Sequence, residues 1–431
     1  MYKKIFEKSN QDFLYNLIYL TIAFLLLTVN LYLFYIFYLL SILFLYKINQ
    51  TKKVKKATLI IPIVFYFIKY LSALLYNKKV WDHLSLGYSN IFMDMRSTIR
   101  QIKCQYLDAT NLNTVNTVEN KICPIFDGYG PLFHQLKVDI ININLTTNII
   151  SIFSYILILS LAYQMVKDDK YLPIASLLIV SPPVNLLLNQ MNIDVIIFMV
   201  GIFVLYKENI NINLRISIFA ILIFLKVHPA GALIGFFVYF YKKKSRKLML
   251  FSFLPILLYV FFIFVNPESV VSQQRPTGPY NAFGLLSTGQ YIWITFFDRA
   301  VGYRLVLIIC FFILIILFLA LFSNNFSLRL KLEESFFNFG ILFWLLLNFV
   351  YANYDYRLLL LIFFLIYNLP KLDIITLFIT TIYIYLSPFI TDMNENIFNF
   401  LSLFKTFLFL ITFYFLLTAV KELVSEIKFF R

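Results

Sequence analysis

The chain has 431 residues, of which 61% are hydrophobic, 19% aromatic and only 14% charged. Because an ordinary soluble domain carries about 25% charged residues, this composition excludes a soluble globular protein. The net charge of +15 does not indicate nucleic-acid binding, because the lysines gather in short clusters between apolar runs, where they act as topology signals.

Apolar segments of about 20 residues, enough to cross a hydrocarbon core of about 30 Å, recur along nearly the whole chain. The sequence therefore predicts an all-α fold, a polytopic transmembrane helical bundle of about 12–14 spans that forms one domain over residues 1–431. Residues 13–46 are expected to cross the membrane twice. Residues 1–46 are expected to belong to the mature protein, because no small-residue cleavage site follows the first apolar run. The other spans are expected near 58–76, 148–166, 171–188, 193–207, 215–227, 231–241, 248–265, 301–322, 335–352, 357–369, 374–390 and 397–418.

Basic clusters set the expected orientation of these spans. They all fall on one side of the alternating pattern, and the short loops of the other side contain almost no Lys or Arg, which places the clusters in the cytoplasm. The clusters lie at 47–56, 167–170, 207–215, 242–247, 327–334 and 420–431. We therefore expect a multi-pass protein of the cell inner (plasma) membrane, with cytoplasmic termini and two extracytoplasmic loops, 77–147 and 266–300.

An amphipathic helix is expected inside the first outer loop, over residues 89–107, and such a helix suits the membrane surface. It has an apolar face, a basic face and a polar stripe between them. The apolar face consists of Phe92, Met95, Ile99, Ile102 and Tyr106. The basic face consists of Arg96, Arg100 and Lys103, and the polar stripe consists of Asp94, Ser97 and Gln101. An N-cap at Ser89 or Asn90 places Asp94 in the first turn, where a carboxylate stabilises the helix dipole. That stabilisation is the alternative to a catalytic role for Asp94.

Ionisable residues at membrane depth are functional candidates, because burying a charge in lipid is costly. Lys226 and His228 close an apolar segment at its outer end, where Pro229 disfavours helical geometry at His228. Neighbouring outer turns add the polar side chains of Gln190, Asn192, Asp194, Arg275, Tyr280, Asn281, Asp355 and Arg357. We expect these residues to line one outer pocket. The alternatives are that Lys226 extends to the outer headgroups and that Asp355 and Arg357 form only a loop ion pair.

Several stretches resemble the GT-C glycosyltransferases, specifically the bacterial polyprenol-phosphate-mannose-dependent mannosyltransferases. "FMDMRSTIRQIKCQYLDA" (92–109) resembles the Asp-containing first outer loop of that family, and "DGYGPLFHQL" (127–136) is similar to its Tyr-Pro-Pro-like turn. "NQMNIDVIIFMVGIFVLYK" (189–207) and "IFLKVHPAGALIGFFVYFYKKKSRK" (223–247) resemble its Gly-Gln-x-Asn turn and its Lys-x-x-Pro helix end. The chain departs from the family pattern at Gly130 and Asn189 and in the length of the outer loop.

The resemblance implies a GT-C-like fold and transfer of a sugar, mannose or a similar hexose or pentose, from a polyprenyl-phosphate donor to a glycolipid or polysaccharide acceptor outside the cytoplasm. It matches Asp94 to the catalytic base, and Lys226 and His228 to the helix end beside the donor phosphate. Tyr129 is a candidate stacking face for a sugar, or else part of a plain Asp-Gly turn. The guanidinium group of arginine neutralises phosphate and orients it through paired hydrogen bonds. The further candidates for binding the donor phosphate are therefore Arg275 and Arg357.

Other functions have less support in the sequence. Three histidines without metal-ligand spacing and three cysteines predict no metal site, and without a phosphate-cradling glycine-rich loop we expect no cofactor. The expected partners are the polyprenyl-phosphate sugar, the glycan acceptor and membrane lipids, with no nucleic acid. A polysaccharide repeat-unit polymerase or ligase is an alternative enzyme. A lipid-linked oligosaccharide flippase is an alternative from another class, although transporters place polar residues at the membrane midplane.

Two of the three cysteines lie in the first outer loop. Cys104 and Cys123 can form a disulfide there, in an oxidising periplasm or cell exterior. Cys310 lies in an apolar run and is expected to stay a buried thiol.

Overall fold

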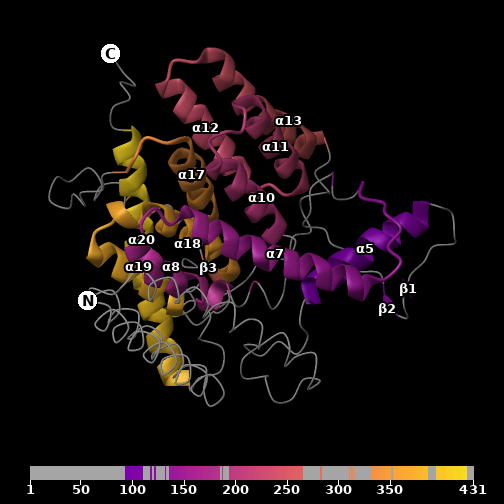
Figure 1. Cartoon of the computed structure of the whole chain (residues 1–431), viewed down its shortest axis with the longest axis horizontal. Coiled ribbons are helices and arrows are strands. Elements are labelled where there is room, and N and C mark those ends of the chain that lie inside the picture. Colours follow the sequence, from indigo (N-terminus) through magenta and orange to yellow (C-terminus); the bar gives the residue numbers. More distant parts are fainter. Residues whose placement is uncertain are drawn as a thin grey trace, which may run out of the picture.

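Helices make up most of the computed structural model, and they pack side by side around a common apolar core (Figure 1). The described residues are 93–109, 117–118, 121–122, 132, 135–184, 187, 194–265, 282–283, 310, 312–313, 315, 332–350, 353–386 and 395–424. The predicted membrane hairpin at 13–46, the predicted span at 58–76 and most of that at 301–322 lie outside the described residues.

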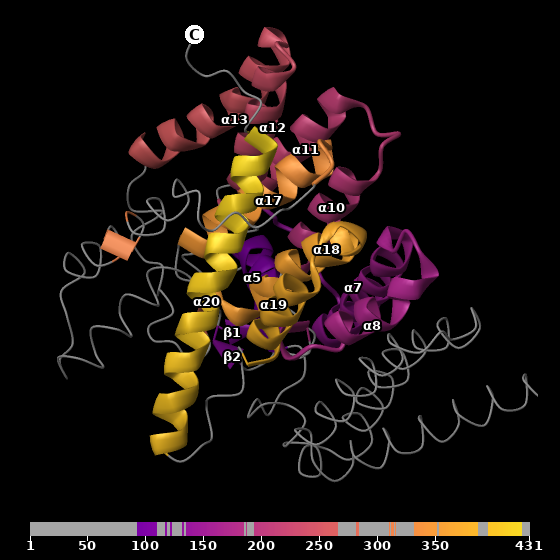
Figure 2. The ribbon, with the colours of Figure 1, turned by 90° about the vertical axis from the view of Figure 1, so that its left-hand side faces the viewer.

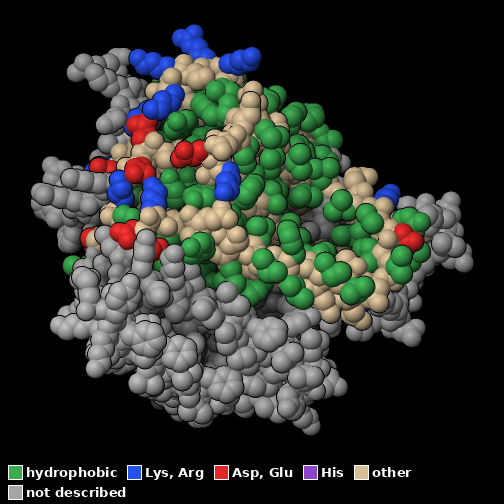
Figure 3. All heavy atoms as spheres, viewed as in Figure 1, with side chains coloured by type: hydrophobic (Ala, Val, Ile, Leu, Met, Phe, Trp, Pro, Cys, Tyr) green, Lys and Arg blue, Asp and Glu red, His purple; other side chains and the backbone are tan. Residues whose placement is uncertain are grey.

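Three of the described helices are long and apolar enough to cross a membrane. They are α7 (Ile143–Met165), α13 (Arg246–Val265) and α20 (Glu395–Val424), the last over residues 403–424. α13 leaves apolar side chains such as Leu257 and Phe261 exposed, and hydrophobic side chains cover much of the described face in Figure 3. Water disfavours a surface of this kind, whereas lipid accepts it. These helices indicate a membrane protein, as the composition predicts.

Six shorter apolar helices occupy the positions of predicted spans within the described part of the chain. They are α10 (Asp194–Tyr206), α11 (Ile212–Leu225), α12 (Ala230–Lys242), α17 (Phe336–Val350), α18 (Leu359–Asn368) and α19 (Ile374–Leu386). A span perpendicular to the membrane needs about 20 residues. Apolar helices are present at the predicted positions, but each of these six is shorter than a full hydrocarbon core requires.

The predicted span at 171–188 is wrong as a single helix. A short 3-10 helix, η2 (Asp169–Tyr171), leads into α8 (Leu172–Ile179), which has 8 residues. Prolines occupy positions 182 and 183, and a residue that precedes proline is disfavoured in helical geometry. This explains the interruption at Ser181, after which helical geometry resumes at 182–184.

The described helices run alternately between two ends of the bundle. α10 ends beside the end of α7, where the Tyr206 hydroxyl donates to the Gln164 carbonyl at 2.6 Å. α11 returns, and α12 runs back to Lys242, which pairs with Glu334 at 3.0 Å just before α17 begins. α18 returns from the far end of α17 and leads into η5 (Leu369–Lys371). We call the end that contains Lys242 and Glu334 the polar end.

The polar end gathers basic segments that the sequence places together in the cytoplasm. Glu333 lies 2.9 Å from Lys167 and 3.2 Å from Lys371, and Glu334 lies 2.8 Å from Lys243. Hydrogen bonds from these lysines hold the pKa of both glutamates below the usual value. Figure 3 shows the charged side chains along the upper left of the molecule. Three of the predicted basic segments, 167–170, 242–247 and 327–334, therefore meet at one end of the bundle, where Lys371 joins them.

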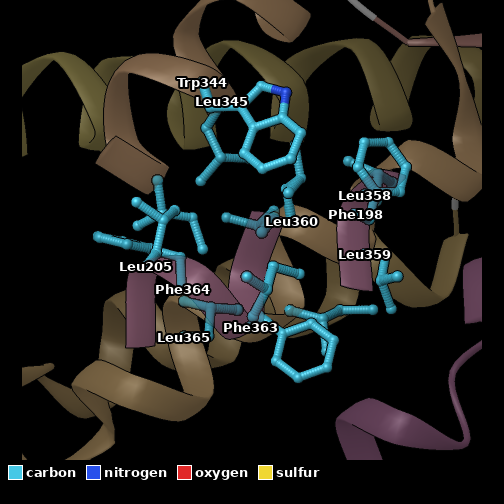
Figure 4. Packing of buried hydrophobic residues seen from close by; sticks show 14 of the residues in the cluster. Phe198, Leu205, Trp344, Leu345, Leu358, Leu359, Leu360, Phe363, Phe364 and Leu365 are labelled. Atoms are coloured by element: carbon cyan, nitrogen blue, oxygen red, sulfur yellow. The ribbon is translucent and has the colours of Figure 1, made fainter. Parts of the chain in front are cut away.

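Glycines set the close packing of α12 against α17. Gly231 and Gly235 lie four residues apart on α12, the small-residue spacing that lets two helix backbones approach. A β-carbon at Gly231 would lie 2.6 Å from Trp344 Cα and 2.7 Å from Phe343 O, so only glycine fits. This contact fixes Trp344 in the core, where Figure 4 shows it near Phe198 and the side chains of α18.

Helices α19 and α20 form one flank of the bundle. In Figure 2, α20 is the long yellow helix that runs beside α19 and α17. The Phe349 ring of α17 stacks on the Phe409 ring of α20 with centroids 5.5 Å apart. The Tyr385 hydroxyl of α19 donates to the Leu177 carbonyl of α8 at 2.7 Å. These contacts join the C-terminal helices to the helices that carry the site described below.

The predicted helix of the first outer loop is present as α5 (Met93–Ala109), but part of its apolar face packs against protein, which the sequence interpretation does not include. Met95 and Ile99 are each 2% exposed, and α5 packs against α7. This part of the apolar face is therefore covered by protein rather than by lipid headgroups, because the bundle offers it an apolar partner.

The cysteines have the predicted bonding states where the structure describes them. Cys104 is disulfide-bonded, and Cys310 is a free, buried thiol. Cys123 lies outside the described residues. It follows directly after β2 (Lys121–Ile122), which pairs with β1 (Thr117–Val118) in an antiparallel hairpin that packs on α5.

Candidate functional site

Asp194 is the centre of the candidate site. Its side chain is 0% exposed, and three side chains from other elements contact its carboxylate. Lys226 Nζ lies 2.6 Å from Oδ1, Arg357 Nε donates to Oδ2 at 2.9 Å, and His228 Nε2 lies 3.4 Å from Oδ1. Four residues that the sequence predicts at one depth therefore meet in space, at the end of the bundle opposite the polar end.

Helix ends bring Asp194, Lys226 and His228 together. Asp194 is the first residue of α10, where the helix dipole favours a carboxylate. α11 ends at Leu225, and Lys226 follows it in an extended conformation, with φ −160° and ψ 139°. Pro229 then starts α12. The predicted break at the Lys226–Pro229 segment is thus confirmed, and it turns two polar side chains toward the start of α10.

A small sheet carries Arg357 to the same place. β3 (Ala282–Phe283) pairs with β4 (Asn353–Tyr354), so that Ala282 lies opposite Tyr354. The 3-10 helix η4 (Asp355–Leu358) follows β4 at once and contains Arg357. The second predicted outer loop, 266–300, therefore reaches the edge of the site through β3.

His228 is held in one tautomer by Trp344. Trp344 Nε1 donates to His228 Nδ1 at 3.1 Å, and an indole N–H is a donor only. Nδ1 is therefore an acceptor, and Nε2 carries the proton that faces Asp194. Burial lowers the pKa of His228 to about 4, although the hydrogen bond with Asp194 opposes this shift. His228 thus orients Asp194 without adding a charge.

The lowered pKa of His228 predicts a pH-dependent stability. Between the ordinary pKa of 6.5 and about 4, the unfolded chain binds a proton at His228 before the folded protein does, so stability falls as the pH falls through this window. His228→Gln keeps a neutral donor and removes this titration. We expect the unfolding temperature of the parent to drop more than that of the variant on acidification from about pH 7 to about pH 5. Parallel pH profiles from differential scanning fluorimetry would contradict the assignment.

Two cations meet one carboxylate in the described contacts of the cluster. Lys226 and Arg357 both contact Asp194, while His228 is neutral. The cations are also the more accessible partners, because the side chains of Lys226 and Arg357 are 12% and 14% exposed and that of Asp194 is fully buried. An anion that enters from the surface would meet cations first. The arrangement suits phosphate, which lysine neutralises and arginine orients.

The structure brings together four of the predicted site residues and leaves the others undecided. Asp94 lies near the start of α5 and Asp355 in η4, and for both only the backbone is described. The remaining predicted site residues lie outside the described residues: Tyr129, Gln190, Asn192, Arg275, Tyr280 and Asn281.

Two alternative, non-functional interpretations of the sequence do not fit the described contacts. Lys226 does not extend to outer headgroups, because its ammonium group contacts Asp194 and its side chain is largely buried. Arg357 does not form only a loop ion pair with Asp355, because its guanidinium bonds Asp194 across 163 positions of sequence.

Trp344 is the residue of this site that the sequence interpretation misses. It lies inside an apolar run, and its rings contact Phe198 and Phe219 at centroid distances of 5.6 Å. A tryptophan in such a run is normally interpreted as a core residue. The only feature that indicates a further role is its N–H group, which needs a hydrogen-bond partner when it is buried. The spacing of Gly231 and Gly235 in "AGALIG" was the second available signal, since it marks the face of α12 that α17 approaches.

The site has four distinguishing features: a buried carboxylate, two cations bound to it, one neutral histidine and a tryptophan that fixes its tautomer. A function has to be argued from these features and from the sequence pattern. No protein-family model, curated protein or solved structure matches this chain.

Proposed function

We propose that this chain is an integral membrane glycosyltransferase of the GT-C type. It transfers a sugar, mannose or a similar hexose or pentose, from a polyprenyl-phosphate donor to a glycolipid or polysaccharide acceptor on the extracytoplasmic side of the plasma membrane. The single observation that supports this most is the buried Asp194 held between Lys226 and Arg357. The Asp194 carboxylate holds two cationic side chains in place at the end of apolar helices, where a lipid phosphate has access.

In this proposal Lys226 and Arg357 bind the donor phosphate. The bond between the anomeric carbon and the phosphate oxygen breaks, and the acceptor hydroxyl oxygen forms the new bond to that carbon. The hydroxyl proton passes to Asp94, the proposed general base. The phosphate leaves with one more negative charge than it carried in the donor, and stabilisation of this growing charge by preorganised cations lowers the barrier.

His228 has a positioning role rather than the phosphate contact that the resemblance implies. Both of its ring nitrogens face protein partners, Trp344 on one side and Asp194 on the other. Asp194 in turn holds both cations at fixed positions. Preorganisation of this kind matters because a misplaced charge loses much of its effect on a transition state.

A transfer assay tests the proposal. The purified protein in lipid nanodiscs is incubated with polyprenyl-phosphate mannose labelled in the sugar and with a glycolipid acceptor, and the release of polyprenyl phosphate is followed. Labelled acceptor and released polyprenyl phosphate in equal amounts are the expected result. Release of polyprenyl pyrophosphate from a pyrophosphate donor would instead support the polymerase or ligase. Movement of an intact lipid-linked sugar across vesicles without transfer would support the flippase.

The proposed orientation predicts opposite sides for the two ends of the bundle. Val138 is 53% exposed before α7, and Lys247 is exposed in the first turn of α13 near the polar end. We expect a membrane-impermeant maleimide to label Val138→Cys in intact cells and Lys247→Cys only after permeabilisation. The native Cys104 and Cys310 give little background, because one is bonded and the other buried. Labelling of both variants in intact cells would contradict the orientation.

A further inference from the structure

Helix α5 buries a row of polar side chains. Thr98 and Gln101 are 1% and 6% exposed, as deeply buried as their apolar neighbours Met95 and Ile99. Thr98, Gln101 and Gln105 follow one another at intervals of three and four residues, which places them on one face of a helix. The backbone position of Asp94, four residues before Thr98, belongs to the same row. The buried surface of α5 therefore includes a polar row beside its apolar face, where an ordinary core helix would be apolar.

Two polar atoms of this row are buried without a hydrogen-bond partner in the described part of the protein. They are Oε1 of Gln101 and Oε1 of Gln105. A buried polar group without a partner is unfavourable, and a bound ligand can supply that partner. Amide oxygens accept hydrogen bonds, so a matching ligand must donate them. Hydroxyl groups do so.

A hydrophobic cluster connects α5 with helices of the Asp194 cluster. Ile102 of α5, Ile196 of α10 and Leu225 of α11 all pack against it, and Ile196 and Leu225 also pack against the main core. Ile196 comes two residues after Asp194, and Leu225 comes directly before Lys226. Through Ile102, α5 therefore shares an apolar neighbourhood with the helix ends that carry the carboxylate and one of the cations.

We propose that Thr98, Gln101 and Gln105 form the binding surface for the sugar hydroxyls of a carbohydrate acceptor. This inference rests on the proposed function in one respect, because that function identifies the bound carbohydrate as the acceptor. The hydroxyl chemistry of the ligand follows from the two buried amide oxygens on α5 alone. The sugar ring lies along α5, and the apolar cluster at Ile102 accommodates the less polar part of the ligand.

Binding of a defined probe tests this site without any need for transfer. Octyl α-mannopyranoside is titrated against the protein in nanodiscs by ligand-observed NMR, and an octyl oligo(ethylene glycol) ether with the same tail but no sugar serves as the reference. The parent protein is expected to bind the mannoside and not the ether. Gln101→Leu keeps the shape and removes the acceptor, so its affinity should fall about tenfold or more. Lys103→Gln, at a partly exposed position on the opposite face of α5, is the matched control and should bind as the parent does.

Stability distinguishes a ligand site from a structural network. If Gln101 Oε1 is unsatisfied without ligand, Gln101→Leu unfolds at the same temperature as the parent or a higher one. Equal binding of mannoside and ether by the parent, unchanged mannoside binding by Gln101→Leu, or a lowered unfolding temperature of Gln101→Leu would each overturn the proposal.

The α5 site and the transferase fail independently. Mannoside binding that depends on Gln101, in a protein that transfers no sugar from any polyprenyl-phosphate donor, would leave the α5 site standing and remove the transferase. Sugar transfer that is insensitive to Gln101→Leu would do the reverse.

Discussion

Asp194→Asn is expected to destabilise the protein by about 3–5 kcal/mol, the cost of removing one partner from a buried ion pair. Lys226 and Arg357 lose the carboxylate that lies 2.6 Å and 2.9 Å from them, and both cations stay in a largely buried place. An asparagine of the same shape supplies no compensating charge. The free energy of unfolding from chemical denaturation in detergent micelles gives the measurement.

Two further variants make this test specific. Asp139→Asn changes the same residue type at an exposed position before α7 and is expected to shift stability by less than about 0.5 kcal/mol. The double variant Asp194→Asn with Lys226→Met removes one of the two stranded cations, and it should recover part of the loss because residues in contact are not additive. Stability of Asp194→Asn equal to that of Asp139→Asn would show that the carboxylate does not hold the cluster together.

Asp94→Asn is expected to reduce sugar transfer by about two to four orders of magnitude while the protein stays folded, because the variant keeps the shape and loses the general base. The α5 row supports this choice, since the backbone position of Asp94 continues the face that carries Thr98 and Gln101. Initial rates of transfer and the unfolding temperature, measured on the same preparation, separate catalysis from folding. Asp139→Asn again serves as the control.

A parental transfer rate for Asp94→Asn would move the base to another carboxylate of the same loop. Asp82, Asp108 and Asp127 are then the candidates, each tested by the same substitution. Retention of activity by all four variants, with transport of an unmodified lipid-linked sugar, would replace the transferase by the flippase.

Local chemistry made the centre of the site predictable. Pro229 forces an interruption after Lys226, and Asp194 interrupts two apolar runs, so both side chains lie at helix ends whatever the tertiary packing. The alternating basic segments then assign these ends to one level, and the fold brings Lys226, His228 and Arg357 into contact with Asp194. An apolar helical chain offers few positions at which a charged side chain is stabilised, so this part of the prediction succeeds.

Packing of one helix on another was not predictable in the same way. α17 is apolar apart from Asn338, Gly340 and Asn348, so the sequence does not say which face meets α12 or that Trp344 reaches His228. The burial of α5 was missed for a related reason. Its apolar stripe fits a membrane surface and a protein interface equally well, and the choice depends on a partner, α7, that lies elsewhere in the sequence.

The most direct test of the account is the affinity of the purified protein for a polyprenyl phosphate such as undecaprenyl phosphate, measured in nanodiscs for the parent, Lys226→Met and Lys103→Gln. Lys226→Met keeps the length of the side chain and leaves Arg357 bound to Asp194. The account predicts that Lys226→Met binds about 10- to 100-fold more weakly than the parent, or about 1.4–2.8 kcal/mol, while Lys103→Gln binds as the parent does. Equal affinities of Lys226→Met and the parent would contradict the assignment of the Asp194 cluster as the phosphate site.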